Sequence, residues 1–505
     1  MVQRETHRKP GYEAFPLTPD IEKRPTESSA KTVVRNSLFL FGQNALVTVA
    51  SVVITAIIAR RLGKTDYGTF TYAFAFANLF FVFASMGLRP VTVRAIAQTP
   101  DRLVPYLGMM FPLRLVLGLV ATAVLLLLSR LLHQDRMVIL TVAIASGTVL
   151  FNSVSSIFRD VFQGFENLSV EAVTAVLVRA FTFLGALLAI ALGGGLLSLA
   201  WVYAAGGGIG CLYPYIVLRK QHIAVRPRVN ASEALGELRK GLPFALASIL
   251  AIFTSRINPI LLGTLSTQAM VGVYAAAMSI TSVLQAVPDA IATSLFPTVA
   301  RGYRTQASKT SHLLQRAFFY LALLGLPIAV GGFLCSDVII GTIFGHKFVE
   351  TPPVFRLLIL SVPLEFLMLP ANFVLGAMHL QKAVLIRTAI GAALNVFLSF
   401  LLIPRYGAVG SAWALLATYF FCCIASLAIL ARHIRVFAEP ARYARLAAAN
   451  LVFGLILFSM RQFNPFLVIP AGALLYLGLT LVFRLMSFRQ MSDFLRQSLG
   501  APKAA

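Results

Sequence analysis

The sequence predicts an all-α polytopic membrane protein with about fourteen transmembrane helices, and three observations lead to that fold class. First, 58% of its 505 residues are hydrophobic and only 12% are charged, whereas a soluble domain carries about 25% charged residues. Second, the hydrophobic residues gather in long runs, most of them near the roughly 20 residues that cross a bilayer as a helix. Third, the basic residues are concentrated in the connections on one of the two sides that these runs define.

The elements can be taken in chain order. Residues 1–30 are polar and rich in proline, so we expect a disordered cytosolic tail there. Apolar runs follow near 37–59, 69–88, 105–129, 137–158, 170–192, 196–218, 241–263, 271–296, 316–337, 355–376, 383–403, 409–431, 445–461 and 465–485. The longest connection, 219–240, is too short for a catalytic domain.

The distribution of Lys and Arg sets the predicted topology. With the N-terminus inside, 30 of the 43 basic residues fall in inside segments, 8 in outside loops and 5 within spans. This bias satisfies the positive-inside rule and places both termini in the cytosol. It also explains the net charge of +24 without a nucleic-acid partner, and it predicts a multi-pass protein of the cytoplasmic (inner) membrane.

An internal repeat divides the chain into two predicted halves. Trp201 and Trp413, the two tryptophans, lie in similar Ala-Trp contexts, and Gly68 aligns with Gly272 at an offset of 204. Six spans separate the copies, so both halves have the same orientation, which predicts a parallel repeat with the substrate site between them. The expected parts are a six-helix lobe at 31–220, a cytosolic linker at 221–240, a second six-helix lobe at 241–435, and helices 13 and 14 with the C-terminal tail at 436–505.

The most informative stretch is 241–297, because two adjacent spans there carry a charge next to a proline. Arg256 lies beside Asn258 and Pro259, and Asp289 follows a proline. A charge at membrane depth is costly and is retained where it faces a bundle interior or a wet cavity. Proline loosens the backbone hydrogen bonds of a span. We therefore expect these two spans to form cavity walls.

The charged side chains within the spans can be compared by their estimated depth in the membrane. On a rise of 1.5 Å per residue, Arg114 and Arg179 lie about 13 Å above the inner face, Arg256 about 22 Å, Asp289 about 10 Å and Glu365 about 16 Å. The depths predict that Arg256 has no acid at its own level. Near the interface, the long side chain of Arg387 is expected to snorkel toward water.

Two interpretations of these charges remain open. Arg114, Arg179 and Arg256 could bind an anionic substrate together with Asn258, because the arginine fork suits a pyrophosphate. Alternatively, the arginines could pair with Asp289 and Glu365 as internal ion pairs or coupling groups. Arg256 is the strongest binding candidate, because it lacks an obvious partner.

Several segments together resemble the bacterial oligosaccharide flippases, or polysaccharide transporters, of the multidrug/oligosaccharidyl-lipid/polysaccharide exporter superfamily. They are ARRLGKTDYGTF at 59–70, GLPF at 241–244, SRINPILLG at 255–263, VGVYAAAMSI at 271–280, SLFPTVAR at 294–301 and LNVFLSFLLIPRYGAVGSAWA at 394–414. The resemblance implies a V-shaped transporter of six plus six helices that moves a polyprenyl-pyrophosphate-linked oligosaccharide to the outer leaflet for cell-surface polysaccharide biosynthesis. Many members have Asp where this chain has Asn258, so an acid-based role does not carry over to that position.

Two other function classes compete with a flippase. A cation-coupled multidrug antiporter of the same superfamily would favour a carboxylate-rich pocket, which the buried arginines oppose. A membrane polysaccharide polymerase or ligase would need a longer outer loop than the roughly 17 residues at 338–354. The sequence has no metal-ligand cluster, nucleophile–base constellation or nucleotide fold, so we expect a transporter without a cofactor. The expected partners are the lipid-linked oligosaccharide, membrane lipid and polysaccharide assembly proteins such as a polymerase or chain-length regulator.

Overall fold

The computed structural model describes residues 30–223, 225–286, 288–289, 291–292, 299, 307–434, 439–460 and 465–485. The predicted tail at 1–30 lies outside these residues except for its last position. The chain divides into two units, one formed by 1–46 with 488–505 and the other by 47–487. The second unit contains the helices discussed below, and all of its regular elements among the described residues are helical.

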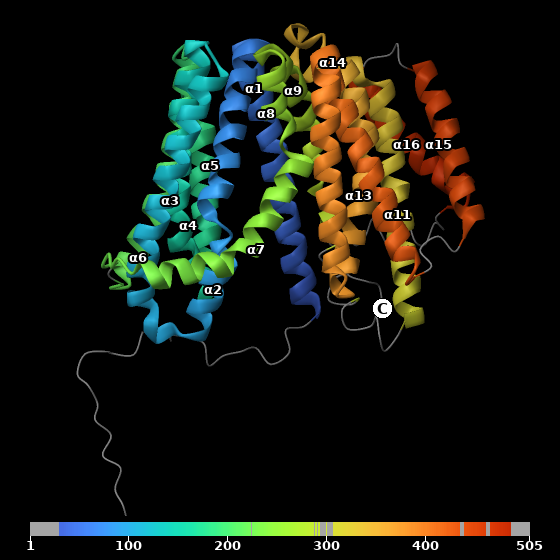
Figure 1. The fold of residues 1–505 in the computed structure, drawn as a ribbon. Helices are drawn as coiled ribbons and strands as arrows, with labels where there is room; N and C mark the ends of the chain where they lie inside the picture. Colours follow the sequence, from blue (N-terminus) through green and yellow to red (C-terminus); the bar gives the residue numbers. More distant parts are fainter. Residues whose placement is uncertain are drawn as a thin grey trace, which may run out of the picture. The chain divides into compact units, whose positions relative to one another are not determined.

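The helices run mostly side by side (Figure 1). In chain order they are α1 (Ala30–Ser85), α2 (Leu88–Gln98), α3 (Leu103–Leu132), α4 (Arg136–Gly164), α5 (Leu168–Ala191), α6 (Leu196–Lys220), α7 (Ala231–Ser255), α8 (Asn258–Leu265), α9 (Gln268–Leu284), α11 (Ala307–Leu334), α12 (Ser336–Phe344), α13 (Thr351–Ala377), α14 (Gln381–Ala431), α15 (Pro440–Met460) and α16 (Pro465–Val482). Short 3₁₀ turns, η1 (Pro100–Arg102) and η2 (His346–Phe348), precede α3 and α13.

Among the described residues, nine helices are long and apolar enough to cross a membrane, or ten if the bent pair α7–α8 counts as one span. Each predicted apolar run coincides with helix, although the end of the run at 271–296 lies partly outside the described residues. The protein is therefore a multi-pass helical membrane protein, as predicted. The number fourteen stays a prediction.

Two of the long helices are folded back on themselves at a glycine. α14 has 51 residues, which would measure about 76 Å if straight, against a hydrocarbon core of about 30 Å. Its backbone breaks at Gly407, where φ is 54°. A Cβ on Gly410 would lie 2.3 Å from the carbonyl oxygen of Leu402, although the two residues would be about 12 Å apart in a straight helix. α14 is thus two arms, and α1 has a similar break at Gly63, where φ is 80°.

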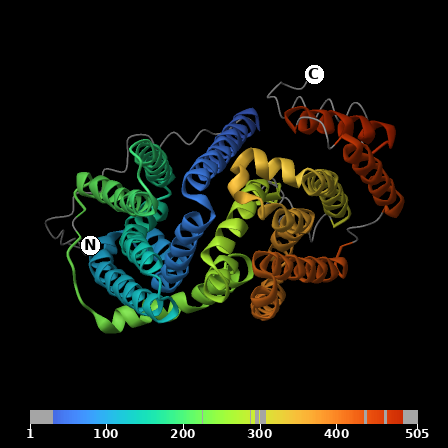
Figure 2. The ribbon, with the colours of Figure 1, turned by 90° about the horizontal axis from the view of Figure 1, so that it is seen from above.

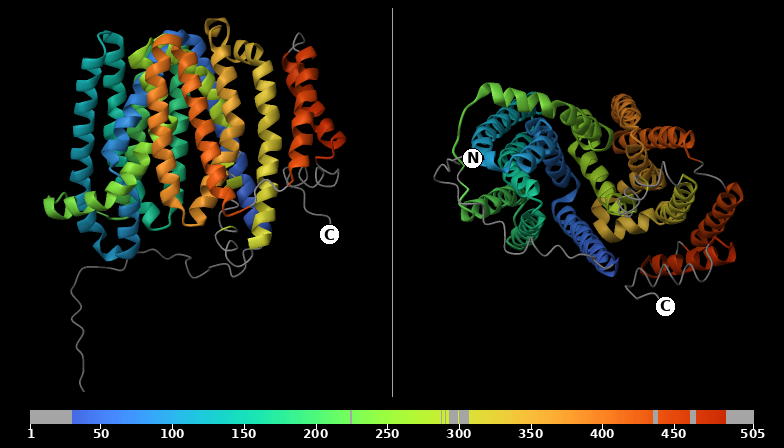
Figure 3. Two further views of the ribbon diagram at one scale, coloured as in Figure 1. Left: turned by 45° about the vertical axis from the view of Figure 1, so that its right-hand side comes forward. Right: turned by 90° about the horizontal axis from the view of Figure 1, so that it is seen from below.

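The span predicted at 241–263 is also broken. α7 ends at Ser255 and α8 begins at Asn258, and the two axes differ by 59°. Pro259 has no N–H to donate, and its ring conflicts with the carbonyl four residues earlier, so the helix cannot continue through this point. At its other end α7 begins at Ala231, within the stretch predicted as the inter-lobe linker. That first part of α7 runs along the lower edge of the bundle beside α2 (Figure 3).

The two halves repeat the same connections. α4 joins α5 through Glu166 at φ 59°, and α13 joins α14 through His379 at φ 61°. In the next connection of each half, Gly193 (φ 78°) ends α5 and Gly407 breaks α14. Trp201 and Trp413 follow these glycines and are exposed, while the alanine before each tryptophan is fully buried. The division of the chain into two six-helix lobes stays a prediction.

A glycine crossing joins the halves where α1 meets α9 (Figure 2). A Cβ on Gly68 would lie 1.7 Å from the oxygen of Gln268, and one on Gly272 would lie 1.9 Å from the oxygen of Lys64. Residues 64 and 268 differ by the same 204 positions as the two glycines. The contact is therefore reciprocal, as in an isologous interface in which residue i meets j and j meets i.

Candidate functional site

The break between α7 and α8 brings Arg256 to the surface of the bundle. Arg256 is the C-cap residue of α7, and its backbone N–H donates to the carbonyl of Ile252 at 2.7 Å. Its side chain is exposed, and among the described residues it forms no ion pair within 4.0 Å. Broken membrane helices present unpaired backbone groups at such points, and these recur as binding sites for charged groups in transporters.

Glu365 of α13 faces the same region. It is only 8% exposed, and it accepts a 2.8 Å hydrogen bond from the Nε2 of Gln285 just beyond α9. Arg256 and Asp289 both act on it electrostatically. Glu365 is therefore an acid within electrostatic range of Arg256, although the two form no ion pair within 4.0 Å.

Asn258 is fully buried, contrary to its expected place beside a substrate. Its Nδ2 donates to the hydroxyl of Tyr274 at 3.2 Å and to the carbonyl of Ser411 at 3.3 Å. Its Oδ1 accepts from the Nδ2 of Asn395 at 2.9 Å. All of this network is neutral, and it ties α8 to α9 and to both arms of α14.

Arg114 is also enclosed, with 1% of its surface exposed. Its Nη2 lies 2.9 Å from Asp160 and its Nη1 donates to Ser156 at 2.6 Å. Asp160 was not predicted as a partner, because the predicted apolar run ends at residue 158. The expectation that Arg114 contributes an unpaired charge to a cavity is thus not met.

The remaining site prediction, Arg179, lies on an exposed part of α5. The structure does not bring it into an ion pair among the described residues. Asp289 is exposed just after α9 and lies within electrostatic reach of Glu365. Of the six predicted site residues, then, Arg256, Glu365 and Asp289 form one cluster, and the other three lie in separate surroundings.

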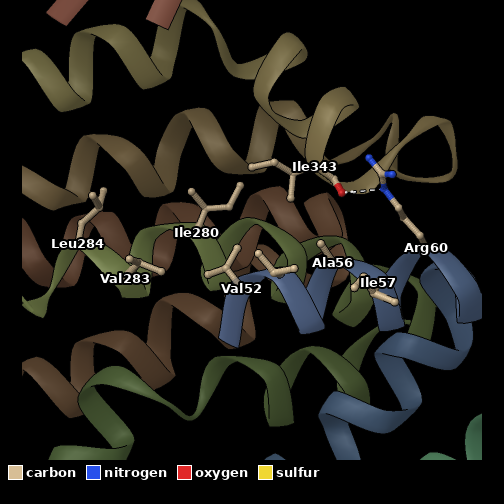
Figure 4. A pocket seen from close by; sticks show the side chains of 9 residues that line it. Val52, Ala56, Ile57, Arg60, Ile280, Val283, Leu284 and Ile343 are labelled. Carbon is tan, nitrogen blue, oxygen red and sulfur yellow. Dashed lines mark hydrogen bonds between the residues drawn. The ribbon is translucent and has the colours of Figure 1, made fainter. Parts of the chain in front are cut away.

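A cavity of about 480 Å³ lies between the first arm of α1 and the C-terminal part of α9. Its walls are aliphatic apart from one cation (Figure 4), and they comprise Val52, Val53, Ala56, Ile57, Arg60, Ile280, Val283, Leu284 and Ile343. Arg60 Nε donates to the carbonyl of Ile343 at 2.8 Å. Gln285, the partner of Glu365, directly follows Leu284 at the cavity wall, so the cavity and the acid cluster adjoin along the chain.

Polar contacts close the end of the bundle next to this cavity. Lys64 Nζ lies 2.6 Å from Glu350, and Lys347 donates to the carbonyl of Arg60 at 3.4 Å. These bonds join α1 to the segment between α12 and α13. No sequence signal pointed to them, because the paired residues are nearly 290 positions apart. Groups of His, Cys, Asp and Glu that could hold a metal do not occur among the described residues.

The chain was compared with known proteins. The family described as "Polysaccharide biosynthesis protein" matches residues 33–303, more than half of the chain. The chain belongs to this family. It is 22% identical to the "Probable low-salt glycan biosynthesis flippase Agl15" of Haloferax volcanii, over 90% of this chain and 96% of that protein. It is equally similar, at 22% and with the same coverage, to the "Stage V sporulation protein B" of Bacillus subtilis.

Solved structures share the fold of this family member. The lipid II flippase MurJ in an inward closed conformation superposes with a TM-score of 0.70, covering 92% of this chain and 99% of that one at 13% identity. A multidrug resistance MATE family transporter in an inward-facing conformation gives 0.63, covering 76% and 97% at 14% identity. At these identities the likeness concerns the fold alone.

Proposed function

We propose that this protein is a flippase that moves a polyprenyl-pyrophosphate-linked oligosaccharide across the cytoplasmic membrane for cell-surface polysaccharide biosynthesis. Its family and the flippase named among its relatives support this function. Two six-helix lobes, 31–220 and 241–435, would alternate in opening to the two sides of the membrane, with both termini in the cytosol. Such a transporter makes and breaks no covalent bond, so it is not an enzyme.

The observation that carries the proposal is the exposed guanidinium of Arg256 at a helix break within an apolar span. A cation that faces neither bulk water nor a close ion pair is stabilised when an anion visits. Arginine binds phosphate groups through two parallel N–H bonds, which fits the pyrophosphate of the lipid carrier. Arg179 is a second candidate contact, whereas Arg114 and Asn258 have structural roles.

The aliphatic cavity between α1 and α9 suits part of the polyprenyl chain. Sugar hydroxyls placed against these walls would lose their hydrogen bonds to water without replacement, at a cost of a few kcal/mol each. The carrier chain has no such groups. We therefore assign the cavity to hydrocarbon and the Arg256 region to the charged headgroup.

Glu365 and Asp289 are proposed to couple substrate binding to the state of the transporter. A pyrophosphate at Arg256 would compete with the attraction between Arg256 and Glu365. A drug antiporter could also use these acids, but the family match favours a glycan substrate. Polymerase and chain-length proteins that act on the same lipid-linked glycan are the expected functional partners.

The test is transport of a fluorescent polyprenyl-pyrophosphate disaccharide by the full-length protein in proteoliposomes. Loss of a bond to a charged group costs about 1.5–3 kcal/mol, so Arg256→Ala should slow transport roughly 10- to 100-fold. Arg256→Lys keeps the charge but loses the bidentate fork of arginine. Its transport rate should lie between that of the unaltered protein and that of Arg256→Ala. Arg130 is an exposed arginine in the last turn of α3, so Arg130→Ala is the matched control and should transport normally.

A second variant separates binding from internal pairing. If Arg256 only neutralises Glu365, then Arg256→Ala/Glu365→Gln should restore transport. If Arg256 holds the substrate, the double variant stays slow while its thermal unfolding in detergent is unchanged. Full transport by a well-folded Arg256→Ala protein would refute the proposal.

A further inference from the structure

We infer that the segment 219–242 is a docking surface for the headgroups of anionic phospholipids. The inference concerns a surface that the transport proposal does not use, and it holds for any transported substrate. The surface, here called the linker surface, consists of the exposed basic residues Arg219, Lys220, Arg226, Arg228 and Arg239.

Acidic residues do not cancel this charge. The segment 219–242 contains two acids, Glu233 and Glu237. Glu237 is buried, because it accepts a 2.9 Å hydrogen bond from the hydroxyl of Tyr106 and lies 2.7 Å from Lys240. Only Glu233 opposes the five cations at the surface. The linker surface therefore has a net positive charge, and such clusters of basic residues bind anionic lipid headgroups.

The backbone under these cations is held in place rather than looped freely. The N–H of Arg228 donates to the carbonyl of Gly108 on α3 at 2.8 Å. A Cβ on Gly108 would lie 2.3 Å from the carbonyl oxygen of Arg226, so the chain approaches α3 as closely as a glycine permits. Arg226 and Arg228 therefore extend from a backbone segment that is already held in place. Less conformational entropy is lost when they bind a phosphate than if the segment were free.

An apolar stripe on α7 lies next to the cations. At 100° per residue, Leu235, Leu242 and Leu246 fall within about 40° of one another on the helix surface, and they are 51%, 47% and 53% exposed. The face about 100° away carries the buried Gly241 and Ala245. A helix that exposes leucines beside basic residues lies in the membrane interface with its apolar side toward the acyl chains.

This stripe identifies the partner as a lipid. Leu235 is in the first turns of α7, and Leu246 is within the predicted span at 241–263, so the exposed face is continuous from the interface into the membrane. Val229, 87% exposed, extends the apolar surface toward the arginines. A soluble acidic protein would account for the cations but not for leucines that continue into the bilayer.

The test measures lipid binding to the purified full-length protein in a neutral detergent by native mass spectrometry, with dioleoyl phosphatidylglycerol against dioleoyl phosphatidylcholine. Each basic residue contributes about 1 kcal/mol near an anionic surface. Arg226→Gln/Arg228→Gln should therefore bind phosphatidylglycerol on the order of 30-fold more weakly. The difference should shrink in high salt, because salt screens exposed charges.

The control variant is Arg130→Gln/Arg136→Gln, which removes two exposed arginines, one in the last turn of α3 and one at the start of α4. It should keep the affinity of the unaltered protein, and both variants should keep its thermal midpoint without lipid. The inference is overturned if the linker variant keeps its affinity or if the control loses as much. Equal binding of the two lipids by the unaltered protein would also overturn it and would point to an acidic protein partner.

Discussion

Arg114 and Arg256 both interrupt an apolar run, yet the structure gives them opposite surroundings. Arg114 is enclosed by α3 and α4 and bonded to Asp160 at 2.9 Å. Arg256 lies exposed at a helix break, near Glu365 but without an ion pair among the described residues. Each member of a buried ion pair depends on the other, because removing one leaves an uncompensated buried charge. An exposed, unpaired one is available to a ligand.

The difference reflects the two helices that carry them. α3 has Pro112 inside it but continues as one helix, so Arg114 keeps the register that points it at α4. α7 stops at Ser255 before Pro259, and the chain turns by 59°. The same residue type within an apolar run is thus structural where the helix continues and accessible where it breaks.

The largest expected effect is on the buried pair. Arg114→Met removes the close partner of the buried Asp160, which keeps only a longer 3.7 Å contact with the half-exposed Arg89, so the free energy of unfolding should fall by about 3–5 kcal/mol. Thermal unfolding in detergent will measure this. Arg114→Met/Asp160→Leu removes both charges and should recover most of the loss. A single variant as stable as the unaltered protein would show that Arg114 does not depend on this pair.

Arg387 is a buried arginine whose hydrogen-bond partners are neutral, in contrast to Arg114. The sequence predicted a side chain reaching the interface, but Arg387 is 7% exposed. Its Nη1 donates to Ser426 at 2.6 Å and to Asn372 at 3.0 Å, both neutral partners. Arg387→Met should cost about 1.5–3 kcal/mol, less than Arg114→Met, because no carboxylate is stranded. An equal or larger loss in the same unfolding assay would contradict this ranking.

Arg89 is the exposed arginine next to the buried pair of Arg114 and Asp160. Its Nη2 lies 2.9 Å from Glu171, but 49% of its side chain is exposed. Arg89→Gln should therefore lower stability by less than about 1 kcal/mol. Unfolding in 1 M salt should reduce the difference further through screening. A loss as large as that of Arg114→Met would mean that the 3.7 Å contact between Arg89 and Asp160 stabilises the buried carboxylate as much as Arg114 does.

The smallest expected change in stability is at Arg256. Arg256→Ala removes an exposed side chain and should alter the free energy of unfolding by no more than about 0.5 kcal/mol. Together with the slowed transport predicted above, this would complete the contrast with Arg114. A loss of several kcal/mol would instead make Arg256 the partner of Glu365.

Part of the candidate site could be predicted from the sequence. Charge within an apolar run identified Arg256, Asp289 and Glu365, which the structure gathers into one cluster. Helix rise alone could not arrange them, because the estimate took no account of the turn before Pro259. Asp160 was missed because hydropathy ends a span where polar residues begin, although the helix continues to Gly164.

The apolar part of the site and the contacts that close it could not be predicted. The cavity is formed by α1 and α9, more than 200 positions apart, with walls of ordinary aliphatic residues. Lys64 and Glu350 are also ordinary surface residues until the fold pairs them. Such contacts depend on how helices pack, and many packings satisfy the same pattern of apolar residues.

The sequence by itself determined that this is a helical multi-pass membrane protein, because hydropathy is a local property of the chain. It marked Gly68 and Gly272 as equivalent. Only the tertiary structure decided that the two equivalent glycines touch, that Arg114 is enclosed and Arg256 exposed, and that α7 begins at Ala231, before the predicted span. Those outcomes depend on helix packing across the halves, where a glycine lets two backbones meet and a proline redirects a helix.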